Sequence, residues 1–426
     1  MKLGCRVLNI LLILPALIAQ TSYGQSPQVL QPSDHCRNFQ NDALVTFTDP
    51  DLEEVVRSAL SLGAADALTC ELVSGLTRLA VPTSIERVVY GGTLRPSPTK
   101  PFESLEGIQN LSNLTNLSII NRLLVDISPL SELENLQTLN LHTNWISDIS
   151  PLSALVNLQE LIVSENPISD ISPLKGLTRL TRLQVHGLYP YQLQHYLNFD
   201  DGRDPNVVFN GITDISPLSE LTELRHLRIH LNNISDISPL SRLTNLTHLR
   251  IYDNKITDIS SLRNLRNLKL LWAHNNSITD ISALSEMTEM VQLGLNGNTI
   301  TNAQALNGLT SIEYLFLSDN NITDITWSGS LLNLSVLRLE NNQISDVDPL
   351  QYLTNLRELS LARNESLYNV QPLQANAGIG PGVELDLRFT HVPCADMDRF
   401  EQRGVSLLRV TALNGSACPG RRMEDP

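Results

Sequence analysis

A repeat of 22 residues constrains this sequence more than any other feature. Counting forward from Asn144 in steps of 22 leads to an asparagine at every position up to Asn364 except one, which is Leu188. The repeated asparagines are Asn144, Asn166, Asn210, Asn232, Asn254, Asn276, Asn298, Asn320, Asn342 and Asn364. Since no insertion shifts this count, we expect a stack of similar units, in which each unit buries its apolar side chains against its neighbours.

Each unit predicts a strand, a bend and a short helical turn. The motif Leu139-x-Leu141 alternates with period two, which is typical of a strand with its leucines pointing inward. Asn144 follows where the strand ends, so its amide can bond the bent backbone, and stacked copies would form a buried ladder. Ser150-Pro151 then predicts a helix N-cap followed by proline at the first helical position. Leu152 and Leu155 of that turn should face back into the core.

The sequence motif of the repeat resembles that of a known family. The phrase Asn-x-Ile-x-Asp-Ile-Ser-Pro-Leu begins at Asn166, and again at Asn210 and Asn232. It resembles the leucine-rich repeat superfamily, in particular the bacterial 22-residue subclass found in internalins, over residues 103–387. This resemblance implies an α/β solenoid, with a curved parallel sheet on its concave face and short 3₁₀ or helical turns on its convex face. It also implies that the concave face binds a protein partner.

The two ends of the chain predict caps. Residues 49–60 should form a helix with Asp49 as its N-cap, Pro50 in its first turn and one apolar stripe, and this helix resembles the N-terminal cap of internalin-like chains. Residues 85–90 are expected to be the first strand and residues 91–101 a loop. We therefore divide the chain into a signal peptide (1–24), a linker and helical cap (25–98), about twelve repeats (99–387) and a C-terminal cap and tail (388–426).

The first 24 residues predict a secretory signal peptide. Lys2 and Arg6 precede an apolar run at residues 7–19, and Ser22-Tyr23-Gly24 offers a cleavage site. A membrane anchor is the weaker interpretation, because this run of 13 residues is shorter than the roughly 20 that a bilayer requires. We expect the mature chain to be secreted or periplasmic, without membrane insertion, and monomeric.

The cysteines divide into two pairs once Cys5 is removed with the signal peptide. Cys36 and Cys70 lie near the start of the mature chain, and Cys394 and Cys418 lie near its end. In an oxidising compartment this distribution predicts one disulfide at each end, because the two ends of a long rod are too far apart to be bridged.

Charge and motif content exclude several classes of function. With 45 acidic and 30 basic residues the formal net charge is −15, which argues against a general nucleic-acid binder. No phosphate-binding loop, zinc cysteine cluster or nucleophile elbow is present, so we expect no cofactor, no metal and no enzymatic activity. Cys394-x-Asp396 resembles the catalytic motif of bacterial repeat-containing ubiquitin ligases, but only 32 residues follow Cys394, so a disulfide is the stronger interpretation.

Alternation along each strand places the residues one, two, four and six positions before the repeated asparagine on the concave face. Arginine, histidine and aromatic residues gather at these positions between residues 182 and 316. The expected partner-binding residues are Arg182, His186, His226, Arg228, His230, His248, Arg250, Tyr252, Trp272, His274, Tyr314 and Phe316. Tryptophan, tyrosine and arginine dominate interface hot spots, although sheet surfaces also favour aromatic side chains for structural reasons. The histidines further predict stronger attraction for anionic partners below about pH 6.5.

The unit that begins at Leu188 keeps the length of 22 residues but loses the motif, since Tyr189-Pro190-Tyr191 follows it. Two interpretations remain open, namely a degenerate repeat within the stack and a projecting loop beside the binding face. Asp204, His226 and His248 occupy one column on successive strands. We interpret that column as a solvated polar row rather than a metal site, because no fourth ligand is evident.

The function we expect is that of a secreted, non-enzymatic protein that binds a partner protein through its concave sheet face. The first alternative is binding of a carbohydrate or cell-envelope polymer, because Tyr252, Trp272 and Phe316 carry rings that can stack on sugars. The second alternative is a hydrolase with an unrecognised site, although no appended catalytic domain is recognisable.

Overall fold

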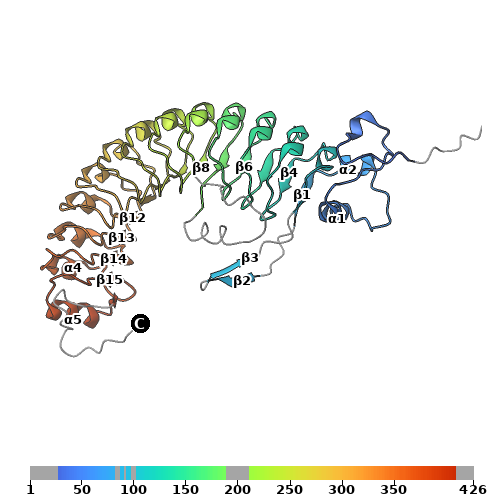
Figure 1. Ribbon diagram of the computed structural model, residues 1–426. Coiled ribbons are helices and arrows are strands. Elements are labelled where there is room, and N and C mark those ends of the chain that lie inside the picture. The colour runs from blue at the N-terminus through green and yellow to red at the C-terminus, as the bar shows by residue number, and fades with distance from the viewer. Residues whose placement is uncertain (1–26, 82–86, 91–92, 97–101, 189–210, 409–426) are drawn as a thin grey trace, which may run out of the picture.

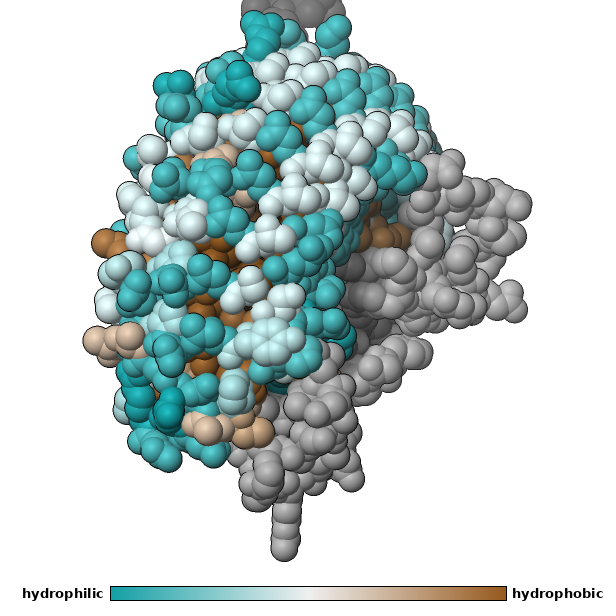
Figure 2. Space-filling view, turned by 90° about the vertical axis from the view of Figure 1, so that its left-hand side faces the viewer, coloured by the Kyte–Doolittle hydropathy of each residue, from teal (hydrophilic) through white to brown (hydrophobic). Residues whose placement is uncertain are grey.

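The computed structural model describes residues 27–81, 87–90, 93–96, 102–188 and 211–408. These residues form an open arc of stacked repeats, with the strands on its inner side and the short helical turns on its outer side (Figure 1). The α/β solenoid that the repeat predicts is thereby confirmed. The face seen in Figure 2 is mostly hydrophilic, with hydrophobic residues in small patches, because neighbouring repeats enclose the apolar core between them.

One parallel sheet of 14 strands runs through the described part of the chain, in the order β1 and then β4 to β16. Its strands are β1 (Arg78–Ala80), β4 (Asn116–Ser118), β5 (Thr138–Asn140), β6 (Glu160–Ile162), β7 (Arg182–Gln184), β8 (His226–Arg228), β9 (His248–Arg250), β10 (Leu270–Trp272), β11 (Gln292–Gly294), β12 (Tyr314–Phe316), β13 (Val336–Arg338), β14 (Glu358–Ser360), β15 (Glu384–Asp386) and β16 (Ser406–Leu408). The central leucines are in register, as Leu139 and Leu161 show, and they are fully buried. The flanking side chains of each strand therefore face the concave surface.

Short turns carry the chain along the convex side between strands. They are η2 (Ile108–Asn110), η3 (Ser128–Glu132), η4 (Ser150–Ala154), η5 (Ser172–Gly176), η6 (Ser216–Glu220), η7 (Ser238–Arg242), η8 (Ser260–Asn264), η9 (Ser282–Leu284), η10 (Gln304–Leu306), η11 (Thr326–Ser330), η12 (Asp348–Tyr352) and the α-helical α4 (Gln371–Ala375). Leu152 and Leu155 are fully buried, as expected.

The capping of these turns differs from the prediction. The serine of Ser-Pro is not the capping side chain; an aspartate two residues earlier has that role. In η4 the carboxylate of Asp148 accepts the amide of Ser150 at 2.8 Å and its hydroxyl at 3.0 Å. The same pair of bonds recurs at Asp236 and Ser238. The aspartate is favoured because its charged oxygens satisfy two donors at once.

The repeated asparagines form the expected ladder. Nδ2 of Asn166 donates to the carbonyls of Leu141 and Val163, both at 3.0 Å. Its Oδ1 accepts the amide of Ile146 at 3.0 Å. Similar bonds occur at the ladder asparagines from Asn144 to Asn364 that the structure describes, whereas Asn210 lies outside the described residues. Each asparagine therefore joins its own strand to the preceding repeat.

The N-terminal cap contains the predicted helix. α1 (Pro50–Ala59) begins after Asp49, whose Oδ1 accepts the amides of Asp51 and Leu52 at 2.8 and 3.1 Å. Leu52 and Val56 are fully buried on the apolar stripe. The remaining helices of the cap are η1 (Cys36–Asn38) and α2 (Cys70–Ser74). They are joined by the predicted Cys36–Cys70 disulfide.

The first strand of the sheet is β1, which pairs with β4, so the expectation that residues 85–90 would take this place was wrong. Residues 87–90 instead form β2 (Arg87–Tyr90), which pairs antiparallel with β3 (Thr93–Pro96) in a separate two-stranded sheet. The expected loop at residues 91–101 therefore contains a strand. The physical reason lies in β1, where Leu79 is buried in register with Leu117 and so starts the leucine column earlier.

The C-terminal cap follows β15. α5 (Cys394–Gln402) buries Met397 and Phe400, and β16 then closes the sheet. Cys394 is disulfide-bonded, while Cys418 lies outside the described residues, so its predicted pairing is untested. Across the described ranges, no helix combines the length and the hydropathy needed to cross a membrane.

The sheet passes over the unit that begins at Leu188. β7 pairs directly with β8, with Arg182 opposite His226, so no strand from residues 189–210 stands between them. The amide of Ile212 donates to Oδ1 of Asn232 at 2.9 Å. The amide of Ile146 donates to Oδ1 of Asn166 in the same way. Residues from Gly211 onward therefore complete the repeat that β7 begins, and the degenerate-repeat interpretation was wrong. The inserted residues themselves lie outside the described part of the chain.

Candidate functional site

Four rings stack in one column on the concave face, and we call them the ring column. They are His186, His230, Tyr252 and His274, which follow strands β7, β8, β9 and β10. Successive ring centroids lie 4.1, 4.1 and 4.2 Å apart, with interplanar angles of 17°, 22° and 11°. The spacing of roughly 4.8 Å between neighbouring strands is what brings these rings face to face.

The ring column is more buried than the sequence suggested. His230 is 3% exposed and Tyr252 is 6% exposed, because each ring covers the faces of its neighbours. Tyr252, expected among the partner-binding residues, is therefore buried within the ring column. The ring column forms the floor of the concave surface, and the side chains beside it are the ones that a partner can reach.

Burial also determines the charge state of these histidines. Loss of solvent lowers the pKa of His186 to about 4 and that of His230 to about 2. Burial likewise lowers the pKa of His226, His248 and His274 below the ordinary value of 6.5. These lowered pKa values displace the protonation of the histidines to lower pH, and the expected gain in attraction for anionic partners moves to lower pH with it.

A second row, which we call the arginine row, lies beside the ring column. Gln184, Arg228, Arg250 and Trp272 occupy matched positions of β7 to β10, in register from strand to strand. Nη1 of Arg228 donates to Oε1 of Gln184 at 3.3 Å. The guanidinium of Arg250 lies over the Trp272 ring, 4.4 Å from its centroid, in a cation–π contact.

Neither Arg228 nor Arg250 forms an ion pair with a carboxylate among the residues that the structure describes. Burial, followed by the nearby charges of Arg250 and Arg182, lowers the pKa of Arg228. Arg182 itself pairs with Glu160 at 3.4 Å. The arginine row is therefore a local concentration of positive charge on a chain whose net charge is −15.

The third row contains Arg182, His226, His248 and Leu270. The rings of His226 and His248 have centroids 4.6 Å apart. Arg182 stands directly opposite His226 in this row, because β7 and β8 are direct neighbours in the sheet, and Asp204 lies outside the described residues. Within the described ranges, no three His, Cys, Asp or Glu side chains gather closely enough to hold a metal ion.

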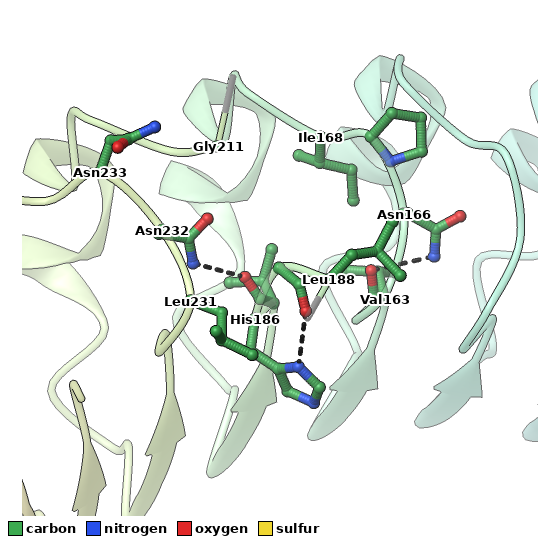
Figure 3. A pocket seen from close by; sticks show the side chains of 12 residues that line it. Val163, Asn166, Ile168, His186, Leu188, Gly211, Leu231, Asn232 and Asn233 are labelled. Carbon is green, nitrogen blue, oxygen red and sulfur yellow. Dashed lines mark hydrogen bonds between the residues drawn. The ribbon is translucent and has the colours of Figure 1, made fainter. Parts of the chain in front are cut away.

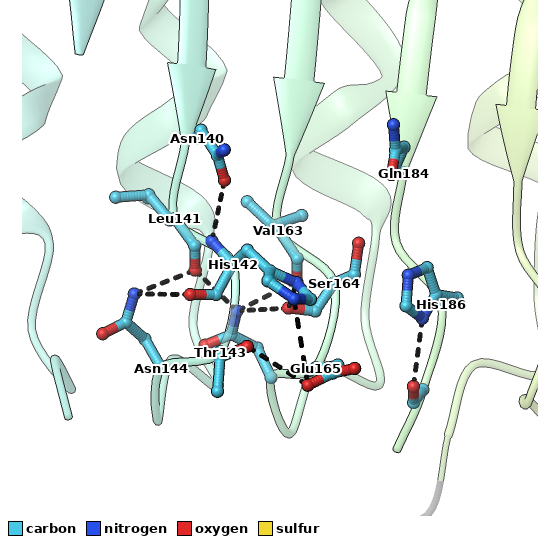
Figure 4. Close-up of polar contacts among 12 residues, drawn as sticks. Asn140, Leu141, His142, Thr143, Asn144, Val163, Ser164, Glu165, Gln184 and His186 are labelled. Atoms are coloured by element: carbon cyan, nitrogen blue, oxygen red, sulfur yellow. Dashed lines mark hydrogen bonds and ion pairs between the residues drawn. The ribbon is translucent and has the colours of Figure 1, made fainter. Parts of the chain in front are cut away.

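Acidic and small residues border the site on the side of β5 and β6. His142 Nδ1 lies 3.2 Å from the carbonyl oxygen of Ser164, and its Nε2 lies 3.9 Å from Glu165 (Figure 4). The rings of His142 and His186 are tilted and 6.2 Å apart, so the continuous stack begins at His186. The negative charge of Glu165 partly offsets the lowering of the pKa of His186.

Two of the predicted residues lie apart from the others. Tyr314 and Phe316 are on β12, and Gly294 of β11 separates Phe316 from Trp272 in the arginine row. Arg338 lies 5.6 Å from the centroid of Phe316 and pairs with Glu358 at 2.5 Å. The structure therefore brings the predicted residues of β7 to β10 together and leaves the two on β12 beside an arginine that is already neutralised.

A cavity of about 90 Å³ opens where the insertion leaves the stack (Figure 3). Its wall includes Leu188, which stands where the ladder asparagine is missing, with Asn166 and Asn232 on either side. Gly187 lies at its edge, and a Cβ there would meet the carbonyl oxygen of Leu231 at 1.9 Å. The cavity thus lies between the segments that follow β7 and β8, and we assign no ligand to it.

Sequence reasoning missed two residues that shape the site. Gln184 accepts the hydrogen bond that positions Arg228, and Gly187 permits the close approach of β8 to β7. The position of Gln184 beside Arg228 would have been clear from an alignment that places β8 directly after β7. The role of Gly187 could be recognised only from its contact with Leu231, because in the sequence a glycine beside a lost motif looks like random variation.

Comparisons with known proteins place this geometry in a family. The sequence matches the family described as leucine-rich repeats (two copies) at residues 244–286 and 332–374. The structure is similar to an internalin, InlF, from Listeria monocytogenes, with 30% sequence identity and a TM-score of 0.70, over 84% of this chain and 95% of that chain. No curated protein sequence matches the chain.

Two further solved structures share the fold. The functional domain of InlJ from Listeria monocytogenes is 18% identical, with a TM-score of 0.55, over 86% of this chain and 69% of that one. The Arabidopsis receptor kinase HAESA, solved in complex with the peptide hormone IDA and the co-receptor SERK1, is 21% identical, with a TM-score of 0.50, over 71% of this chain and 47% of that one. On its repeat, its sheet and its similarity to InlF, the chain belongs to the internalin-like leucine-rich repeat proteins.

Proposed function

We propose that this chain is a secreted, non-enzymatic binding protein that holds a partner protein on its concave face, over strands β7 to β10. The observation that carries the proposal is the arginine row, in which Arg250 lies against Trp272 and next to Arg228. Arginine and tryptophan combine a large contact area with directional hydrogen bonding, and they dominate the energy of protein interfaces. Both side chains are only half-buried, so a partner can reach them.

The secreted character is supported by the cysteines and by the family. The Cys36–Cys70 disulfide and the disulfide-bonded Cys394 suit an oxidising compartment. The non-enzymatic character is supported by the site itself, where the polar side chains are arginines, histidines and amides. Such a set offers contacts but no activated nucleophile paired with a base.

The alternative of carbohydrate binding through the same face has less support. Sugar stacking needs a free ring face, yet His230 and His274 cover the two faces of Tyr252. The Trp272 ring carries the guanidinium of Arg250 on one face. We therefore place a protein partner first.

A crosslinking pull-down tests the proposal. The chain from Gln25 onward is exposed to surface and secreted material from its native setting, beside a variant carrying Arg250→Ala and Trp272→Ala. A matched control carries Arg263→Ala in η8 and Tyr352→Ala in η12, an exposed arginine and an exposed aromatic side chain on the convex turns.

We expect wild type and the convex control to capture the same protein and the concave variant to lose it, with unchanged circular dichroism for all three. Capture by the concave variant together with loss by the convex control would contradict the concave assignment. Capture of glycan without protein would favour the carbohydrate alternative.

A further inference from the structure

The strongest unexplained feature of the concave face is its uncompensated positive charge. The chain has 45 acidic and 30 basic residues, yet the strands β7 to β9 carry Arg182, Arg228 and Arg250 and no carboxylate. Among the described residues, only Glu160 of β6 reaches this cluster, through Arg182. On an acidic protein, such a concentration requires a specific explanation, because like charges at close range repel.

A third arginine at the same strand position has its charge neutralised by a carboxylate. Arg338 of β13 occupies the position of Arg228 and Arg250 in its own strand, and it pairs with Glu358 of β14 at 2.5 Å. The repeat can therefore provide a carboxylate for an arginine at this position. At Arg228 and Arg250 the equivalent carboxylate is missing.

Both uncompensated arginines are held in place. Arg228 donates to Gln184 at 3.3 Å, and Arg250 rests on the Trp272 ring at 4.4 Å. A guanidinium that is already positioned loses less conformational freedom when it binds, and its planar fork matches a carboxylate in a bidentate pair. The two side chains come from register partners on adjacent strands, so their backbones lie about 4.8 Å apart.

We propose that Arg228 and Arg250 bind carboxylate side chains of an acidic, extended segment of the partner protein. This inference rests on the proposed function, since it names the chemistry of the partner at the same surface. It also agrees with the sequence of the two strands, where the neighbouring units His226-Leu227-Arg228-Ile229 and His248-Leu249-Arg250-Ile251 repeat one pattern.

The size of the cluster favours a short acidic segment over a long polyanion. Arg182, Arg228 and Arg250 span three strands, or about 10 Å across the sheet. On one side Glu160 lies on the adjacent β6, and on the other side the next strand carboxylates are Glu358 on β14 and Glu384 on β15, beyond β10 to β13. A nucleic acid or a sulfated glycan that extends beyond the cluster would meet these negative charges and the net charge of −15.

Fluorescence anisotropy with synthetic peptides tests this inference. The probe is a short labelled peptide that alternates glutamate and serine, compared with the same peptide carrying glutamine in place of glutamate, and with a heparin-derived oligosaccharide. The variants are Arg228→Gln, Arg250→Gln and, as the matched control from the same row, Arg338→Gln. All of them are checked for unchanged thermal unfolding.

We expect the glutamate peptide to bind wild type in a salt-sensitive manner, with Arg228→Gln and Arg250→Gln each weakening it about tenfold. Arg338→Gln should change the affinity less than about twofold, because its guanidinium is already paired. Equal binding of the glutamine peptide, absence of glutamate-peptide binding, equal loss in all three variants, or tighter binding of the oligosaccharide would overturn the inference.

The same variants separate this inference from the proposed function. If the pull-down loses the partner with Arg250→Ala and Trp272→Ala but keeps it with Arg228→Gln and in high salt, the concave face binds protein and the acidic-segment inference fails. If the concave variant captures as much protein as wild type, the proposed function fails, and any peptide binding would describe a different surface.

Discussion

The imidazole rings of His186 and His230 stack 4.1 Å apart, although the inserted residues 189–210 separate their strands in the sequence. This contact exists because β8 takes the place next to β7 that the regular count of 22 would give to the inserted unit. The ring column is therefore continuous, and the arginine row beside it is continuous for the same reason. The described strands β7 and β8 therefore present one continuous set of side chains.

Deletion of residues 188–209 should leave a folded protein. The deletion joins Gly187 to Asn210, which supplies an asparagine at the ladder position where Leu188 now stands. Because Ile212 already bonds to Asn232 in the regular manner, the repeat needs no other change. Circular dichroism and thermal unfolding should show a single cooperative transition at or above the wild-type temperature. Loss of that cooperative transition would mean that the inserted unit is part of the stack.

Gly187→Ala should destabilise the fold by about 2–3 kcal/mol. A Cβ at this position would lie 1.9 Å from the carbonyl oxygen of Leu231, so the backbones of β7 and β8 would have to separate. Gly176→Ala in η5 is the control, since a Cβ there meets nothing within 4 Å. Urea unfolding of both variants measures the difference. Equal stabilities would show that the segments after β7 and β8 can move apart at no cost.

Asn342→Ala should cost about 3 kcal/mol of unfolding free energy, because it leaves several buried backbone groups without partners. Its Nδ2 donates to the carbonyls of Leu317 and Leu339, at 3.0 and 3.1 Å, and its Oδ1 accepts the amide of Ile322 at 3.0 Å.

The matched control is Asn333→Ala, an exposed asparagine whose Nδ2 makes a single bond to the Thr310 carbonyl at 2.9 Å. It should cost about 1 kcal/mol or less, because water can replace that bond. Similar losses in both variants, measured by chemical denaturation, would contradict the ladder's role in joining repeats.

His230→Phe should make the protein more stable at acidic pH. Nδ1 of His230 is buried without a hydrogen-bond partner in the described structure, so an apolar ring in the stack leaves no group of its own unsatisfied. The pKa of His230 is lowered to about 2 in the folded protein, against 6.5 as the ordinary value. Below about pH 6.5 the unfolded chain therefore takes up a proton that the folded one does not, and stability falls as the pH falls.

Near pH 5 the phenylalanine variant should exceed wild type by about 2 kcal/mol, and the gap should close above pH 7. His391→Phe, which changes an exposed ring stacked on Tyr368, serves as the control. Unfolding curves recorded across this pH range measure both. A gap that stays constant with pH would mean that His230 has the same pKa in the folded and the unfolded chain.

The sequence predicted those parts of the fold that repeat. The strand leucines, the asparagine ladder and the position of α1 after Asp49 each depend on local pattern, and the structure contains all of them. The first strand was misplaced because the valine-rich residues 87–90 look more like a strand than residues 78–80 do.

The candidate site was predicted less completely, for two physical reasons. The insertion has the length of one repeat, so counting asparagines could not reveal that β7 and β8 are neighbours. The burial of Tyr252 depends on the rings of His230 and His274 in adjacent repeats, and the sequence does not show how these rings stack. The pairing of Arg338 with Glu358, which distinguishes it from Arg250, likewise depends on three-dimensional contact.

Oxidative footprinting of the complex shows which face of the arc the partner covers. The partner recovered in the pull-down is added to the chain, and the hydroxyl-radical labelling of Trp272 and Tyr352 is compared with that of the free chain. Concave recognition over β7 to β10 predicts strong protection of Trp272 and none of Tyr352, which is exposed on the convex η12. Protection of Tyr352 with unchanged labelling of Trp272 would place the partner on the convex face and contradict the account.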